Sequence, residues 1–255
     1  MKKAISILLT LVLTVALCVA PAGALAAQPI TITSVTQNDD ATVTITWNNP
    51  NGGTVTVGSL IMDDGTAGNR INAEFDVVGS TYTYRNLAPG QNYVLLVFPG
   101  VDLENAGMEM ISVPEITQKF EDIYFVVKDA NLAYFDVHGD SYSYNYASGL
   151  NNREIYDMLE DKQFWVKIDF DHVAFSYAQN FQSLTVVTSP TGYVATSALD
   201  IEIAEYTTGF WQTMVYMNQA LADMHDANGE IPTGKYTVEV YLDGNFVGES
   251  YFMIK

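Results

Sequence analysis

A proline–glycine corner that leads to a tyrosine and an alternating strand occurs twice in this chain. The first is Leu87-Ala-Pro-Gly-Gln-Asn-Tyr93, and the second is Ile231-Pro-Thr-Gly-Lys-Tyr236. Proline presets φ and glycine tolerates positive φ, so both stretches favour a reversal of the chain. The strand that follows each corner alternates apolar and polar residues, which is typical of a half-buried strand in an antiparallel sheet. The sequence therefore predicts an all-β fold.

Short β-rich segments alternate with turn clusters through the first part of the chain, at the spacing of a β-sandwich. In one of them Val43, Ile45 and Trp47 share one face while threonines take the other. Seven strands are predicted: Pro29–Val35, Ala41–Trp47, Thr54–Met62, Arg70–Val78, Thr81–Leu87, Tyr93–Phe98 and Met108–Val113. The pattern leaves the pairing of residues 54–78 open.

The stretch from Tyr82 to Val97 resembles the E–F corner of a fibronectin type III domain, and Trp47 stands where that family has its strand B core tryptophan. The resemblance covers about residues 28–114. It implies a sandwich in which Trp47 and Leu87 are buried and the Tyr93 hydroxyl bonds to backbone a few residues upstream. It implies architecture alone, because a fold does not specify a function.

Pro114 punctuates the chain, so a domain boundary is expected at Val113–Thr117, with domains at 27–114 and 116–255. Asn151 and Glu154 predict a capped helix that runs to about Asp161. Strands are expected at Lys119–Val127, Leu132–Val137, Tyr142–Tyr146, Phe164–Phe175 and Leu184–Thr188. Residues 209–217 fit both a helix and a strand; a strand to Met217 and then a short helix stopped by Asn228-Gly229 is favoured.

The C-terminus predicts a hairpin, because Asp243-Gly244 favours a type I′ turn between two alternating segments. Its pattern, Gly-x-Tyr-x-Val followed by Asp-Gly and Phe-x-Ile, resembles the terminal modules of bacterial secreted proteins. Together with the corner at Tyr236, it predicts that the second domain is an immunoglobulin-like sandwich enlarged by one or two short helices.

Residues 1–26 have the features of a signal peptide: Lys2 and Lys3, an apolar run from Ile5 to Val19, and an Ala24-Leu-Ala26 cleavage site. The apolar run is shorter than the roughly 20 residues of a spanning helix. Lipidation of Cys18 is the alternative to ordinary export, although the bulky residue before it makes a poor lipobox. We expect a secreted or cell-surface protein without membrane insertion after cleavage, and without a disulfide, since Cys18 is the only cysteine.

The composition is strongly acidic, with 11 Lys and Arg against 30 Asp and Glu and a formal net charge of −19. Nucleic acid and anionic membranes are disfavoured as partners, because both require a basic patch. Calcium is an alternative explanation for the acidity, with Asp169 and Asp171 among the candidate ligands. Solvated acid is favoured over calcium, because no segment has the ligand density of an EF-hand loop. No cofactor is expected.

Candidate catalytic residues are few. The histidines are His138, His172 and His225; none lies in an H-E-x-x-H motif, and no Gly-x-Ser-x-Gly elbow is present. A pair of glycosidase carboxylates must face each other across a cleft, and spacing along the chain does not show this. A non-catalytic protein is expected.

Aromatic residues crowd the second domain and are the main material for a binding site. They are Tyr134, Tyr142, Tyr144, Tyr146, Trp165, Tyr177, Phe210, Trp211 and Tyr216. Tyr142, Tyr144 and Tyr146 alternate with small polar residues, and with Trp211 they are the candidate binding residues. Exposed rings on a sheet would stack on sugars, whereas the alternative is that the rings form the core. At least one of the three tyrosines is expected to lie in the core, and Tyr146 is the first candidate, because it leads into the predicted helix.

The sequence therefore predicts an exported, non-catalytic binding or adhesion module whose partner is an extracellular glycan or protein. An accessory carbohydrate-binding role is the leading specific hypothesis. The alternatives are a small secreted hydrolase and a structural cell-surface component that binds only other proteins.

Overall fold

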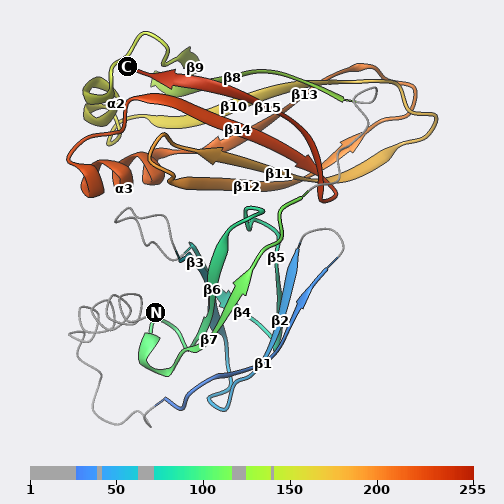
Figure 1. The fold of residues 1–255 in the computed structure, drawn as a ribbon, viewed down its shortest axis with the longest axis vertical. Helices are drawn as coiled ribbons and strands as arrows, with labels where there is room; N and C mark the ends of the chain where they lie inside the picture. Colours follow the sequence, from blue (N-terminus) through green and yellow to red (C-terminus); the bar gives the residue numbers. More distant parts are fainter. Residues whose placement is uncertain (1–26, 39–41, 63–71, 117–124, 139–140) are drawn as a thin grey trace.

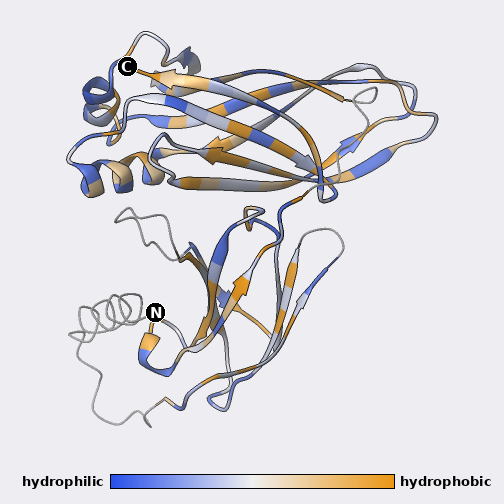
Figure 2. Ribbon diagram, viewed as in Figure 1, coloured by the Kyte–Doolittle hydropathy of each residue, from blue (hydrophilic) through white to orange (hydrophobic). Residues whose placement is uncertain are grey.

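The chain folds into two stacked units of antiparallel sheet (Figure 1). The computed structural model describes residues 27–38, 42–62, 72–116, 125–138 and 141–255, and the side chains of 137–138, 141–143 and 210–211 lie outside this description. Figure 2 shows apolar and polar residues alternating along many of the strands, as expected for sheets with one face buried. The predicted all-β class is confirmed. No helix in the described ranges is long and apolar enough to span a membrane.

The first unit pairs a three-stranded sheet with a four-stranded sheet. The sheet orders are β1-β2-β5 and β4-β3-β6-β7. The strands are β1 (Thr31–Gln37), β2 (Val43–Asn48), β3 (Val55–Ile61), β4 (Asn72–Val77), β5 (Thr81–Tyr84), β6 (Asn92–Phe98) and β7 (Gly107–Ser112), with a short 3-10 helix at Leu103–Asn105 before β7. The pairing that the sequence left open is now defined, because β3 lies between β4 and β6.

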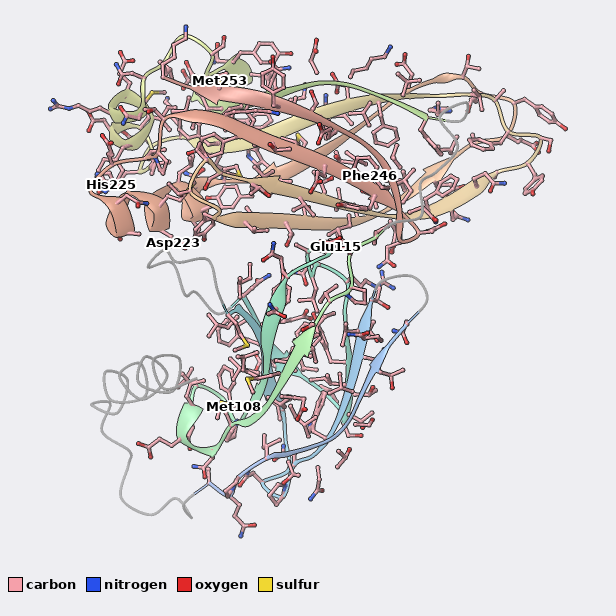
Figure 3. All side chains as sticks on the ribbon, in the orientation of Figure 1. Met108, Glu115, Asp223, His225, Phe246 and Met253 are labelled. Atoms are coloured by element: carbon pink, nitrogen blue, oxygen red, sulfur yellow. The ribbon has the colours of Figure 1, made fainter. Side chains whose placement is uncertain are left out.

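Two apolar clusters form on opposite faces of the sheet that contains β3 and β6. The core between the two sheets includes Trp47, Leu87 and Leu95, which are all buried. The second cluster lies on the other face of β3 and β6 and consists of Leu60, Val94, Leu96 and Phe98. Near it, Met108 and Met110 of β7 are exposed (Met108 is labelled in Figure 3). These two strands are therefore apolar on both faces and do not show the alternation of a one-sided sheet.

The second unit is a sandwich of two four-stranded sheets with two helices at one end (Figure 1). The sheet orders are β13-β10-β8-β9 and β12-β11-β14-β15. The elements are β8 (Phe125–His138), β9 (Ser141–Tyr146), α2 (Asn152–Asp157), β10 (Gln163–His172), β11 (Gln179–Thr188), β12 (Val194–Ile203), β13 (Gly209–Tyr216), α3 (Asn218–Asn228), β14 (Gly234–Leu242) and β15 (Asn245–Ile254). The strand and short helix favoured for residues 209–228 are confirmed.

The structure confirms the turns and helix caps that local sequence patterns predicted. Asn151 and Glu154 form a reciprocal capping box at the start of α2. Gly229 has φ 78° and ends α3 in the left-handed conformation. Asp243 and Gly244 have φ values of 46° and 72°, as a type I′ turn between β14 and β15 requires.

Several predicted bounds were wrong. One strand, β8, replaces the two expected at Lys119–Val127 and Leu132–Val137; residues 119–124 lie outside the described ranges. The helix ends at Asp157, four residues early, and the strand from Phe164 ends at His172. The strand from Thr81 ends at Tyr84, before the corner begins. Strand β12 was not predicted, because Ala, Ser and Asp give it a weak strand propensity.

Strand β15 lies directly against β8, so the two sheets of the second unit approach closely along one side. The Ala130 N–H donates to the Ser250 hydroxyl at 3.1 Å. A Cβ placed on Gly248 would lie 2.9 Å from a methyl group of Val127, closer than side chains normally pack. Glycine at position 248 therefore permits this contact.

The two units touch through the corner of the first. Ala88 is buried with Leu184, Val186 and Tyr241 in a small apolar cluster. Phe246, which is labelled in Figure 3, is partly buried and packs against this cluster. The boundary expected at Val113–Thr117, with domains 27–114 and 116–255, stays a prediction, because the connecting residues 117–124 lie outside the described ranges.

Candidate functional site

The sheet β13-β10-β8-β9 buries one face and presents aromatic rings on the other. In β10, Phe164, Val166 and Ile168 are fully buried in the core, and Trp165 and Lys167 alternate with them on the opposite face. Trp165 pairs with Ala133 of β8 on one side and with Tyr216 of β13 on the other. The strand register therefore places residues from several strands beside Trp165.

Five rings form a continuous series on this face, which we call the aromatic row: Tyr146, Tyr144, Phe135, Trp165 and Tyr216. The centroid of Tyr144 lies 5.3 Å from that of Tyr146 and 5.3 Å from that of Phe135. Phe135 and Trp165 are 6.5 Å apart, and Trp165 and Tyr216 are 5.0 Å apart. The ends of the row are open to solvent, since Tyr146 is 55% and Tyr216 46% exposed.

Ala133 forms a floor beneath the row. It is fully buried, yet it does not belong to the core cluster of the second unit. Its register partners are Tyr146 on one side and Trp165 on the other. Its burial therefore comes from the outer face, where large side chains cover a small one.

Polar groups lie among the rings. The Tyr144 hydroxyl and the Trp165 Nε1 are buried and have no hydrogen-bond partner among the described residues. Buried polar atoms are nearly always paired, so these two groups are exceptions among the rings of the row. The Lys167 Nζ lies 4.2 Å from the Tyr144 ring centroid and 6.0 Å from that of Tyr146, as in a cation–π contact.

The structure brings only some of the predicted binding residues together in the aromatic row. Tyr144 and Tyr146 lie in the row, and Tyr142 continues the same strand, but its side chain is outside the described part. The side chain of Trp211 is also outside it, and its backbone pairs with Phe170. The expectation that Tyr146 lies in the core was wrong: it lies at the end of an edge strand and faces away from the core.

The two calcium candidates are engaged with protein groups. Asp169 accepts a hydrogen bond from the Gln212 amide at 2.6 Å. Asp171 forms an ion pair with Lys128 at 2.9 Å. Within the described residues, no group of three or more His, Cys, Asp or Glu is arranged to hold a metal ion.

The histidines lie on separate elements. His172 ends β10, where its Nδ1 lies 3.0 Å from the Val173 carbonyl oxygen. His225 lies on α3 and stacks on Tyr156 with ring centroids 3.5 Å apart. The side chain of His138 is outside the described part.

Both corner tyrosines bond to upstream backbone. The Ala88 N–H donates to the Tyr93 hydroxyl at 2.8 Å, and burial raises the pKa of Tyr93 to about 12. The Tyr236 hydroxyl donates to the Pro232 carbonyl at 2.8 Å, and burial raises the pKa of Tyr236 also. With the strand orders, these corners define two β-sandwich modules of the fibronectin type III or immunoglobulin-like kind.

Comparisons with known proteins find only distant similarity. No family model and no curated protein matches the chain. Among solved structures, a two-domain fibronectin type III segment of chicken tenascin is 9% identical with a TM-score of 0.24, covering 90% of this chain and 98% of that one. The FN1–FN3 domains of chicken CNTN1 give the same four values. A bacterial ice-binding adhesin is 10% identical with a TM-score of 0.24, covering 91% and 65%. The class therefore rests on the strand orders and corners.

Proposed function

We propose that this protein is an extracellular, non-catalytic binding module of the adhesion type, and that the aromatic row binds a neutral glycan. The observation that carries the proposal is the row itself. Five adjoining rings lie on the outer face of a sheet whose other face already provides the core. Large exposed rings beyond the needs of the core are typical of a contact surface.

A glycan suits the chemistry of this surface. Sugar rings present C–H faces that stack on aromatic rings, and their hydroxyl groups need hydrogen-bond partners. The exposed Tyr146 and Tyr216 side chains carry hydroxyl groups that can donate or accept such bonds. The formal net charge of −19 opposes long polyanions, so a neutral glycan is favoured over an acidic one.

The export expected from residues 1–26 fits this role, because extracellular polysaccharides lie outside the cell membrane. The proposal assigns no catalytic step, since it needs only a surface that holds sugar rings. Binding to a protein partner instead of a glycan is the competing outcome of the test below.

The test compares retention of the purified protein on insoluble cellulose, xylan and chitin, which are neutral, and on alginate, which is acidic. We expect retention on at least one neutral polymer and none on alginate. Tyr146→Ala should weaken retention about tenfold, because an aromatic anchor contributes on the order of 1–2 kcal/mol. Its stability should change little, since an exposed ring leaves no cavity.

Tyr251→Ala is the matched control. Tyr251 has the same 55% exposure as Tyr146 and also lies near a lysine, with Lys235 Nζ 5.0 Å from its ring, but it belongs to β15 in the opposite sheet. It should bind like the unmodified protein. Failure of all three neutral polymers, or equal losses in the two variants, would overturn the proposal.

A further inference from the structure

We propose that the cleft between the two units is a second subsite for the same glycan, so that a long chain contacts both units while a short one occupies only the aromatic row. This inference rests on the proposed function and extends it to ligand length and to the role of the first unit.

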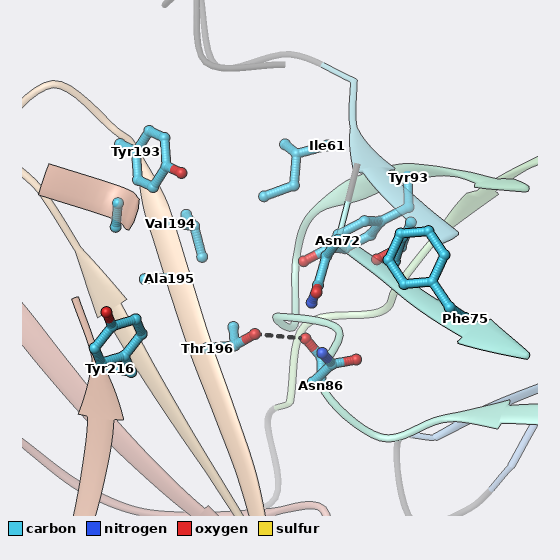
Figure 4. A pocket seen from close by; sticks show the side chains of 13 residues that line it. Ile61, Asn72, Phe75, Asn86, Tyr93, Tyr193, Val194, Ala195, Thr196 and Tyr216 are labelled. Atoms are coloured by element: carbon cyan, nitrogen blue, oxygen red, sulfur yellow. Dashed lines mark hydrogen bonds between the residues drawn. The ribbon is translucent and has the colours of Figure 1, made fainter. Parts of the chain in front are cut away.

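The cleft is a cavity of about 330 Å³ at the junction (Figure 4). Strand β12 and the end of β13 form one wall, and β3, β4 and the corner of the first unit form the other. The side chains that matter for the argument are Asn72, Phe75 and Asn86 on the first unit and Tyr193, Thr196 and Tyr216 on the second. A cavity of this volume is in the size range of small-molecule sites.

Tyr216 connects the cleft to the row. Its ring lies 5.0 Å from Trp165 in the row, and the same residue lines the cleft. From Tyr146 on β9 to Tyr216 on β13 the row crosses three inter-strand spacings, or about 14 Å. A linear oligosaccharide laid along the row is thereby directed into the cleft.

The lining of the cleft has the same chemistry as the row. None of its described lining residues is charged, although the protein is strongly acidic. The two asparagine amides can donate to and accept from sugar hydroxyls, and the Thr196 hydroxyl oxygen can accept. Phe75 is 61% exposed and lines the cleft, so its ring is accessible to a ligand there.

Direct contacts between the units hold the two walls together. The Thr196 hydroxyl donates to the Asn86 carbonyl at 2.8 Å, at the floor of the cleft (Figure 4). Beside it, Arg85 Nη1 lies 3.2 Å from both carboxylate oxygens of Asp200. The buried contact of Ala88 with the second unit adds an apolar anchor. The cleft is thus formed before any ligand arrives, which lowers the entropic cost of binding.

The experiment measures affinity by calorimetry for cello-, xylo- and chito-oligosaccharides from disaccharide to hexasaccharide. We expect affinity to rise with length until both subsites are occupied. Phe75→Ala should weaken hexasaccharide binding about tenfold and leave disaccharide binding unchanged, because Phe75 lies only in the cleft. Tyr146→Ala should weaken binding at every length.

The two variants separate the failures. If Phe75→Ala binds the hexasaccharide like the unmodified protein while Tyr146→Ala is impaired, the cleft inference is wrong and the proposed function stands. If neither variant is impaired, or if no oligosaccharide binds, both are wrong. A Phe75→Ala loss of equal size at every length also overturns the inference, since it would mean that the row alone does not define the short-chain site. Melting temperatures equal to that of the unmodified protein confirm that each variant is folded.

Discussion

The two corners use one sequence motif with opposite hydrogen-bond polarity. Tyr93 accepts from the Ala88 N–H, whereas Tyr236 donates to the Pro232 carbonyl. The position of proline explains the difference. In the first corner alanine supplies the backbone group and retains an N–H; in the second, proline supplies it and has only a carbonyl to offer. The motif therefore places a tyrosine at the corner. The upstream residue whose backbone bonds to the tyrosine determines whether its hydroxyl accepts or donates.

The surroundings of the two corners also differ. Ala88 in the first corner packs against the second unit. Tyr236 is fully buried within its own unit, stacked on Phe252 at 4.9 Å, and its hydroxyl lies 3.9 Å from the Met224 sulfur on α3. The Ala88 N–H stabilises a Tyr93 phenolate and partly offsets the effect of burial on its pKa, while Tyr236 has no such donor. The first tyrosine corner therefore contributes to the contact between the units. The second corner stabilises only its own unit, and we call Tyr236 an internal clamp for this reason.

The largest effect is expected from Tyr236→Ala. Removing a fully buried ring leaves a cavity beside Phe252, at a cost of about 3–5 kcal/mol. Urea unfolding followed by tryptophan fluorescence measures it. A loss below about 1 kcal/mol would contradict the description of Tyr236 as an internal clamp.

Tyr93→Phe keeps the ring and removes the acceptor of a buried N–H. Because Ala88 is only 1% exposed, its N–H gains no water in exchange, and the cost should be about 1–3 kcal/mol. Chemical denaturation of the first unit checks it. An unchanged midpoint would show that the 2.8 Å bond contributes nothing and would weaken the fibronectin type III assignment.

Tyr236→Phe should cost less, about 0.5–1.5 kcal/mol. It leaves the Pro232 carbonyl short of one partner, and under-satisfied carbonyls are tolerated better than unpaired N–H groups. The same unfolding assay, run beside Tyr93→Phe, provides the comparison. If Tyr236→Phe proves the more harmful of the two, hydrogen-bond polarity does not explain the difference between the corners.

Separating the units should have the smallest effect. Fragments 27–114 and 116–255 should each fold, because each unit has its own core. Their amide NMR spectra should overlay on that of the whole protein, with shifts confined to the contacts that Arg85, Asn86 and Ala88 make with the second unit. A collapsed or aggregated 116–255 fragment would show that the first corner is part of a shared core.

Features set by neighbours in sequence could be predicted. The corners depend on Pro, Gly and Tyr within seven residues, the cap of α2 on Asn151 and Glu154, and the last hairpin on Asp243-Gly244. Strand β12 could not be predicted, because an edge strand containing Ala, Ser and Asp is stabilised by its pairing with β11 and not by local preference. The polar residues Lys128, Asp129 and Asn131 similarly concealed the continuity of β8.

The candidate site was predictable only in part for the same reason. The alternation around Tyr144 showed that the tyrosines share a face, but not which face, because a core stripe alternates identically. Trp165 and Tyr216 were recognised only as aromatic residues, and Phe135 was missed. Their place in the row follows from strand register between residues far apart in the chain, as does the cleft between the units.

Gly248 influences how this protein behaves at high concentration. Gly248 lets the edge strand β15 lie against β8. Another part of the same chain therefore covers an edge that would otherwise present free backbone groups. Uncovered edges recruit strands from other molecules and start aggregation. A side chain at position 248 would push the two strands apart and uncover that edge. The first effect of such a substitution would then be aggregation of folded molecules, before the native state is lost.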